Sequence, residues 1–269
     1  HDIGEDATVD DPQRVAELVA RYLQGADVLV ELGVEVLAGE EQLREFVESK
    51  CREEQARVYE ATIHNLQSTY DTYIKNTALE ASDPRLSKLR GHASATLHLL
   101  EGLTHLAHFH ERHENEKGAA RFGTVIATLV PKAEVFSVMV NQILVAAHRA
   151  LEQGRGVAEA LLSDYTHVRE LLVELPDGVS LHARPVALLV GIVNHFGTPV
   201  EFEVGSRRCN AGSILEVLMA LGSHADVSQF TFRGDERPLE HIALLFEHDL
   251  GERGGGALPD ALSYLRPSG

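Results

Sequence analysis

The sequence has little of several residue types that define whole classes of protein. It contains no tryptophan and two cysteines, Cys51 and Cys209, which lie far apart. That excludes a disulfide framework and is typical of the reducing cytoplasm. The longest unbroken apolar run, 185–193, is far shorter than the ~20 residues of a membrane-spanning helix. The first residues also show no signal-peptide pattern. We therefore expect a cytoplasmic protein without membrane insertion.

Basic residues are also scarce. The chain of 269 residues has 24 Lys and Arg against 41 Asp and Glu, which gives a formal net charge of −17. Proteins that bind nucleic acid neutralise phosphates with clustered Lys and Arg, and no such cluster is evident here. The composition therefore argues against a nucleic-acid partner. Hydrophobic residues make up 44% of the chain, and the length is sufficient for two domains.

The first part of the chain shows helical rather than strand periodicity. Residues 1–10 are acidic and unpatterned, and the Asp-Pro pair at 11–12 is typical of a helix start. Further helices are predicted over 40–77, 83–117, 131–151 and 157–167, with the glycines at 154 and 156 ending the third of these. We predict an all-α bundle of four to six helices over residues 1–168.

The pattern changes near residue 169. Apolar residues alternate over 171–175, 200–204 and 230–232, and helical patterns occupy 183–196, 214–221 and 238–249. The order β-α-β-β-α-β-α predicts an α+β domain over residues 169–252. The Gly/Pro-rich end, 253–269, is predicted to be a flexible tail.

A short motif carries the most specific chemistry. Residues 178–186 read Gly-Val-Ser-Leu-His-Ala-Arg-Pro-Val, which places His182 and Arg184 where a strand gives way to an apolar helix. Unpaired N–H groups and the helix dipole favour an anion there, and the Arg184 guanidinium can chelate phosphate oxygens. A histidine can itself accept a phosphoryl group covalently. His182 is therefore the candidate nucleophile.

This motif resembles the active-site segment of HPr, the histidine phosphocarrier of the bacterial phosphoenolpyruvate:sugar phosphotransferase system. A second block, Asn-Ala-Gly-Ser-Ile at 210–214, resembles the Asn-Ala-Lys-Ser-Ile segment of that family at about the right spacing. The likeness covers roughly residues 170–252. It implies an open-faced β-sandwich, a four-stranded antiparallel sheet covered by three helices. Ser180, Val186 and Gly212 depart from the family's usual residues.

The resemblance also implies a function. His182 would accept phosphoryl at Nδ1 from phosphorylated enzyme I and pass it to an enzyme IIA-type acceptor. Arg184 and the backbone N–H groups of Ala183 and Arg184 would hold the phosphoryl group, without a cofactor or metal. Such a protein is a covalent carrier rather than an autonomous enzyme. Ser213 matches a serine that a kinase phosphorylates in some members, and with Glu216 it also fits a capping box, in which each side chain bonds the other residue's N–H.

Two other interpretations remain open. In the first, the domain is a regulatory binding module whose phosphorylation state controls partner binding by the bundle, through intramolecular contact between the two. In the second, the bundle is a metal-binding enzyme, suggested by the histidines 98, 105, 108, 110 and 113 and by Glu-x-x-x-His at 60–64 and 101–105. Helical geometry favours a solvated face for His98, His105 and His108, and a core position for His110.

Overall fold

The computed structural model describes residues 11–113, 130–176, 178–224, 227–252 and 258–265. Two compact units follow from its internal contacts. One is residues 21–161, and the other comprises the described residues of 1–20 and 162–269. The chain is divided at 20/21 and at 161/162, and both points lie within helices. The second lies a few residues before the boundary predicted at 168. None of the described helices is both long and apolar enough to cross a bilayer.

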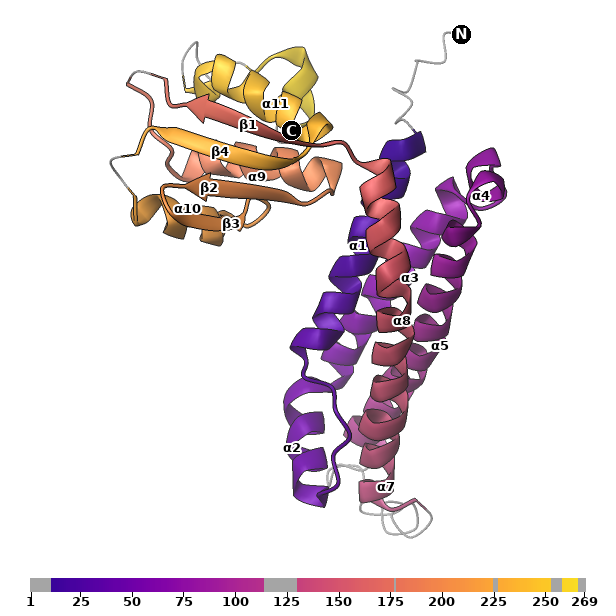
Figure 1. Ribbon diagram of the computed structural model, residues 1–269. Coiled ribbons are helices and arrows are strands. Elements are labelled where there is room, and N and C mark those ends of the chain that lie inside the picture. The colour runs from indigo at the N-terminus through magenta and orange to yellow at the C-terminus, as the bar shows by residue number, and fades with distance from the viewer. Residues whose placement is uncertain (1–10, 114–129, 177, 225–226, 253–257, 266–269) are drawn as a thin grey trace, which may run out of the picture. The chain divides into compact units, whose positions relative to one another are not determined.

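The helical part of the chain buries an apolar stripe on each long helix. Tyr22, Ile63, Leu100 and Leu151 are among its buried residues. Its elements, shown in Figure 1, are α1 (Asp11–Glu31), α2 (Glu40–Lys50), α3 (Glu53–Tyr73), α4 (Ala78–Ser82), α5 (Pro84–His113), α7 (Lys132–Ser137), the π-helical η1 (Val138–Leu144) and α8 (Val145–Tyr165).

The helix predicted over 40–77 is two helices. Cys51 ends α2, and Arg52 adopts an extended backbone with φ −64° and ψ 155° before α3 begins. Lys50 lies in the last turn of α2, and acidic residues occupy the first turn of α3, as the helix dipole favours at each end. Periodicity alone missed this break because the apolar stripe continues on both sides of it.

The end predicted at the glycines 154 and 156 is also wrong, because α8 runs unbroken from Val145 to Tyr165. Gly154 is buried, and a Cβ there would collide with the side chain of Tyr22. The glycine therefore permits close packing of a neighbouring side chain and does not terminate the helix.

The α+β prediction is confirmed. The order is β1 (Val168–Glu174), α9 (Ala183–Phe196), β2 (Val200–Val204), β3 (Arg207–Asn210), α10 (Ile214–Gly222), β4 (Gln229–Asp235) and α11 (Glu236–Glu247). The strands form one sheet in the order β1-β4-β2-β3, and each neighbouring pair is antiparallel (Figure 1).

One face of this sheet carries the core. Val200, Phe202 and Val204 are fully buried, while the glutamates between them are only partly covered on the opposite face. Ring centroids of Phe202 and Phe232 lie 5.1 Å apart across neighbouring strands. Buried residues of α9, α10 and α11 join the same cluster. Strand alternation thus places all three helices on one side, as an open-faced sandwich requires.

The prediction of a flexible tail over 253–269 is wrong for the described residues, 258–265. Beyond the short η2 (Asp249–Gly251), residues 258–265 include η4 (Asp260–Leu265), and Leu258 and Leu262 are buried in the core of the sheet domain. The Tyr264 ring stacks on His195 with a centroid separation of 3.8 Å. Apolar side chains anchor this segment despite its glycine- and proline-rich flanks.

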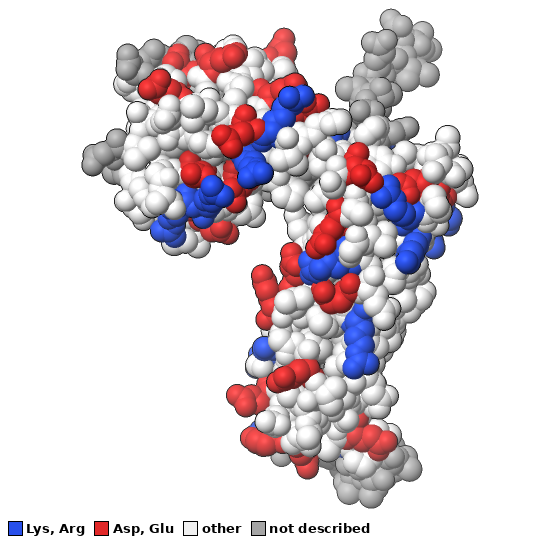
Figure 2. Space-filling model, viewed as in Figure 1, with Lys and Arg blue, Asp and Glu red and all other residues white. Residues whose placement is uncertain are grey.

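Charge is mixed on the surface that Figure 2 presents. Blue Lys and Arg side chains lie among red Asp and Glu side chains over both parts of the chain on this face. The sheet domain contains ion pairs of Arg208 with Glu203 at 2.8 Å and of Arg169 with Glu236 at 2.7 Å. On this face, basic side chains are therefore distributed among acidic ones.

Candidate active site

His182 is the N-cap of α9. Its backbone is extended, with φ −103° and ψ −172°, and its carbonyl accepts the N–H of Val186 at 3.1 Å. The imidazole is half-exposed, and its Nδ1 accepts the backbone N–H of Arg184 at 3.4 Å. That weak bond directs the Nδ1 lone pair toward the start of the helix. A group bound at Nδ1 would therefore lie beside the first-turn amides.

Ala183 and Arg184 are the first two residues of α9, and both are exposed. N–H groups at these positions have no acceptor within a helix, and such groups favour an anion. That of Arg184 donates only the long bond to Nδ1 of His182. The buried Pro185 follows at a position where a missing N–H costs little. The structure thus brings His182, Ala183 and Arg184 together at one exposed helix end, as the sequence predicted.

A residue that the sequence analysis did not identify lies at the same place. Glu252 follows η2, and its Oε2 is 3.3 Å from Nε2 of His182. Its Oε1 is 3.9 Å from Nη1 of Arg184. Seventy positions separate this carboxylate from the histidine, and no local motif links them. Only the packing of the C-terminal segment could show that they meet.

Ser213 is the N-cap of α10, as predicted. Its hydroxyl accepts the N–H of Glu216 at 3.4 Å. The reciprocal half of the predicted capping box differs, because Glu216 Oε2 accepts the N–H of Asn210 at 3.1 Å rather than that of Ser213. The N–H of Ser213 instead donates to the Asn210 carbonyl at 3.1 Å. The Glu216 carboxylate therefore bonds an N–H three residues before Ser213, in the turn that precedes the helix.

The outer side of α10 is apolar and exposed. Ile214, Leu215 and Met219 are 45%, 68% and 46% exposed, while Val217 and Ala220 are buried on the inner side. This helix packs against α9, which carries the candidate site. Contiguous exposed apolar side chains are typical of surfaces that bind another protein. We call Ile214, Leu215 and Met219 the α10 surface.

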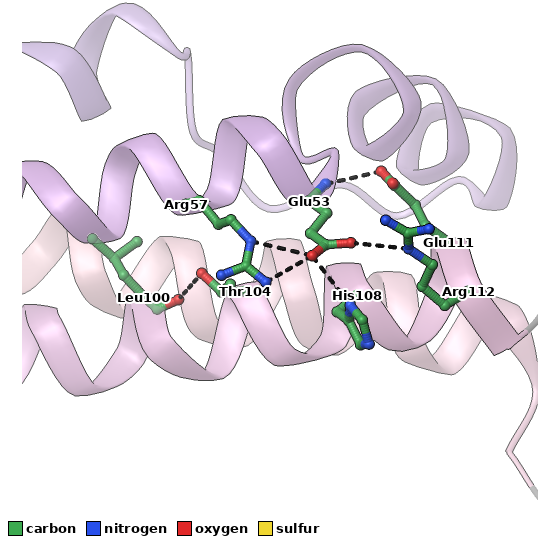
Figure 3. A network of polar contacts seen from close by, with 7 residues as sticks. All are labelled: Glu53, Arg57, Leu100, Thr104, His108, Glu111 and Arg112. Atoms are coloured by element: carbon green, nitrogen blue, oxygen red, sulfur yellow. Dashed lines mark hydrogen bonds and ion pairs between the residues drawn. The ribbon is translucent and has the colours of Figure 1, made fainter.

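One histidine of α5, His108, belongs to a polar network that links two helices. Figure 3 shows a polar network around Glu53, which lies at the start of α3. Its Oε1 lies 2.7 Å from Nη2 of Arg57 and 3.1 Å from Nδ1 of His108, and its backbone N–H donates to Glu111 at 2.8 Å. Hydrogen bonds from Arg57 and then His108 lower the pKa of Glu53 to about 2. This network joins α3 to α5.

Other candidate ligands stay apart. Among the described residues, no group of three or more His, Cys, Asp or Glu side chains is placed to hold a metal ion. His98 is exposed beside Glu101 at 3.0 Å, and His64 and His105 are exposed. His110 is buried in a T-shaped contact with the Phe136 ring, at a centroid separation of 4.7 Å, as expected of a core histidine. The side chain of His113 lies outside the described residues.

Comparison with protein families assigns the sheet domain. Residues 169–247 match the family model described as PTS HPr component phosphorylation site. The match includes His182, Arg184 and Ser213 and ends before Glu252. No solved structure was found to match the chain. Together with the four-stranded sheet and its three covering helices, the match shows that residues 169–247 are a domain of the HPr family, which follows a helical region in this chain.

Proposed function

We propose that this protein carries a phosphoryl group on Nδ1 of His182. The observation that supports this most directly is the position of Nδ1, which faces the Arg184 N–H at the start of α9 within a domain of the HPr family. The phosphoryl donor is phosphorylated enzyme I, charged from phosphoenolpyruvate. The acceptor is an enzyme IIA-type protein.

The transfer needs no bound cofactor. The Nδ1 lone pair of His182 attacks phosphorus, a P–N bond forms, and the bond from phosphorus to the donor's histidine breaks with its electron pair returning to that nitrogen. The N–H groups of Ala183 and Arg184 and the Arg184 guanidinium stabilise the charge on the phosphoryl oxygens. Passing the group to the acceptor reverses these bond changes.

The α10 surface supports a protein partner. Transfer between two histidines requires the donor to approach an exposed nucleophile, and His182 is half-exposed. Ile214, Leu215 and Met219 present apolar area on the helix that packs beside α9. Such area gives most of the contact energy of an interface, and polar residues around it give specificity. We propose that enzyme I and the acceptor dock here in turn.

The decisive experiment incubates the full chain with enzyme I and labelled phosphoenolpyruvate. We expect one acid-labile, base-stable phosphate per chain, and none in His182→Ala. His167→Ala is the matched control, because this histidine is also exposed in the sheet unit and its hydrogen bonds involve its backbone. Undiminished labelling of His182→Ala would refute the assignment.

Ser213 is proposed as a second, regulatory phosphorylation site. A phosphate at this N-cap would meet the first-turn N–H groups of α10, which favour an anion. The partly buried Glu216 carboxylate, however, lies in the same turn and would repel it. A serine kinase of this system should therefore phosphorylate Ser213 more slowly in the wild type than in a Glu216→Gln variant. Equal rates, or no modification of either protein, would count against this site.

A regulatory binding role is the second proposal, and the separate helical unit favours it. Residues 21–161 have their own core, and a cavity of about 550 Å³ is lined by residues of α2, α5 and α7 and by Cys51 and Arg52, which link α2 to α3. A tether keeps two linked units at about millimolar effective concentration, at which even a weak contact is populated. In this proposal the bundle contacts the sheet domain and slows labelling of His182.

The test compares labelling of the full chain with that of a fragment over 162–269 at equal concentration. This fragment retains Leu258 and Leu262, which belong to the core of the sheet domain. Faster labelling of the fragment would support masking by the bundle. Equal rates, with no change when the separate bundle is added, would show that the bundle does not regulate His182.

A further inference from the structure

Two contacts on the His182 ring determine one tautomer. Nδ1 lies 3.4 Å from the backbone nitrogen of Arg184, which can only donate a hydrogen bond. Nε2 lies 3.3 Å from Oε2 of Glu252, which as a carboxylate can only accept one. Both contacts are satisfied together only when Nδ1 carries the lone pair and Nε2 carries the proton. The neutral ring thus has its nucleophilic nitrogen at the start of α9.

Glu252 is held where it can maintain this arrangement. Its side chain is 25% exposed, compared with 51% for His182 and 60% for Arg184. Leu250 and Gly251 immediately before it are buried, and Leu250 packs in the core of the sheet domain. The carboxylate is therefore carried on an anchored backbone, and its position does not depend on the loose geometry of a surface ion pair.

The other carboxylate oxygen also needs a donor. Oε1 of Glu252 is buried, and among the groups that the structure describes none lies within hydrogen-bond distance of it. Nη1 of Arg184 lies 3.9 Å from this oxygen. A buried carboxylate oxygen without a donor is costly, so the carboxylate favours both a protonated Nε2 and a nearby guanidinium.

We infer that Glu252 is a positioning residue for phosphoryl transfer at His182, and this inference depends on the proposed carrier function. When Nδ1 bonds to phosphorus, the ring keeps its proton on Nε2 and becomes cationic, and the carboxylate offsets that charge. When the group leaves, the electron pair of the P–N bond returns to Nδ1. The neutral Nε2–H tautomer is then restored without any proton moving. Orienting carboxylates act on catalytic histidines in this way.

Glu252 is not part of the motif that contains His182 and Arg184. Glu252 lies outside the residues that match the family, 169–247, and it reaches the site through the fold of the C-terminal segment. The family match that includes His182 and Arg184 ends five positions before Glu252.

The first experiment reads the tautomer without any phosphoryl transfer. Ring ¹⁵N shifts of His182 in the full, unphosphorylated chain above pH 8 should show predominantly the Nε2–H form. In Glu252→Gln the amide can donate to Nε2 as well as accept from it, so the Nε2–H fraction should fall. Glu247→Gln is the charge-matched control on an exposed glutamate at the end of α11, and it should leave the ring shifts unchanged. Identical His182 shifts in Glu252→Gln and wild type would overturn the inference.

The second experiment measures labelling by enzyme I. We expect Glu252→Gln to be slowed about tenfold or more relative to Glu247→Gln, on the scale of losing one oriented charge next to the reacting group. Glu252→Asp, which keeps the charge, should recover part of the rate. Faster labelling of Glu252→Gln would mean that the carboxylate repels the incoming phosphoryl group, and it would overturn a positioning role. If wild type is never labelled, the carrier proposal fails, whereas the ring shifts still decide whether Glu252 sets the tautomer.

Discussion

The side chain of Tyr22 occupies the space where a β-carbon of residue 154 would lie. Its hydroxyl donates to the Leu151 carbonyl at 2.9 Å, and the ring is fully buried between α1 and α8. Burial raises the pKa of this phenol far above its usual range. Gly154 is therefore a packing residue within a continuous helix.

Gly154→Ala should destabilise the protein by about 1–3 kcal/mol, the usual range for overpacking a core. The new methyl group meets the Tyr22 ring, which cannot move without losing its bond to Leu151. Gly156→Ala, two residues on, is the control. Its β-carbon meets nothing within 4 Å, so this variant should be more stable by about 0.5–1 kcal/mol. Chemical denaturation of both variants gives their free energies of unfolding. Equal changes in the two variants would contradict a packing role for Gly154.

Arg184→Lys should slow phosphoryl transfer about tenfold to a thousandfold, the effect of losing an oriented charge-stabilising donor. Lysine keeps the charge but loses the planar fork that binds two phosphate oxygens. The guanidinium is exposed, so the fold should be unaffected. Single-turnover labelling by enzyme I gives the rate, and circular dichroism checks the fold. A rate equal to that of wild type would show that Arg184 takes no part.

Ser213→Ala should reduce stability by about 0.5–1 kcal/mol, the lower part of the N-cap range. The hydroxyl bond to the Glu216 N–H is long, and the Glu216 carboxylate keeps its separate bond to Asn210. Labelling of His182 should stay intact. Ser263→Ala, at an exposed position, is the control in urea unfolding. Coincident transitions for the two variants would mean that the cap contributes nothing measurable.

Acidification below about pH 6.5, the ordinary pKa of histidine, should weaken the sheet unit. Burial, and then the nearby His195, lower the pKa of His241 below its ordinary 6.5, and burial lowers that of His195. Below pH 6.5 the unfolded chain therefore binds more protons than the folded one, and stability falls as pH falls. Glu53 lies in the helical unit, and its contribution changes only at lower pH, because its ordinary pKa of 4.5 and its lowered value of about 2 both lie well below 6.5.

The measurement is the unfolding midpoint of wild type and His241→Asn at pH 8, 7, 6 and 5. Asparagine can keep a hydrogen bond to the Tyr264 hydroxyl, which lies 2.8 Å from Nδ1 of His241, without titrating. Wild type should lose stability more steeply than the variant below pH 6.5. If the unfolding midpoints of the two proteins fall in parallel with pH, His241 does not cause the loss of stability.

The sequence by itself determined the features whose signals are local. Alternating residues such as Val200, Phe202 and Val204 can bury one face only in a strand, so the sheet and its inward face followed from them. His182 and Arg184 lie two positions apart at a helix start, where backbone geometry alone places them together. The α+β class and the centre of the candidate site could therefore be predicted from neighbouring residues.

Tertiary structure alone decided what depends on distant contacts. Glu252 reaches His182 across seventy positions because Leu250, Leu258 and Leu262 join the core of the sheet domain. Composition had suggested a flexible tail there, since glycine and proline report local chain freedom and not the burial of the residues between them. The helix end predicted at Gly154 is wrong for the same reason. A glycine that ends a helix and one that admits Tyr22 look alike in sequence, and only the packing of α1 against α8 distinguishes them.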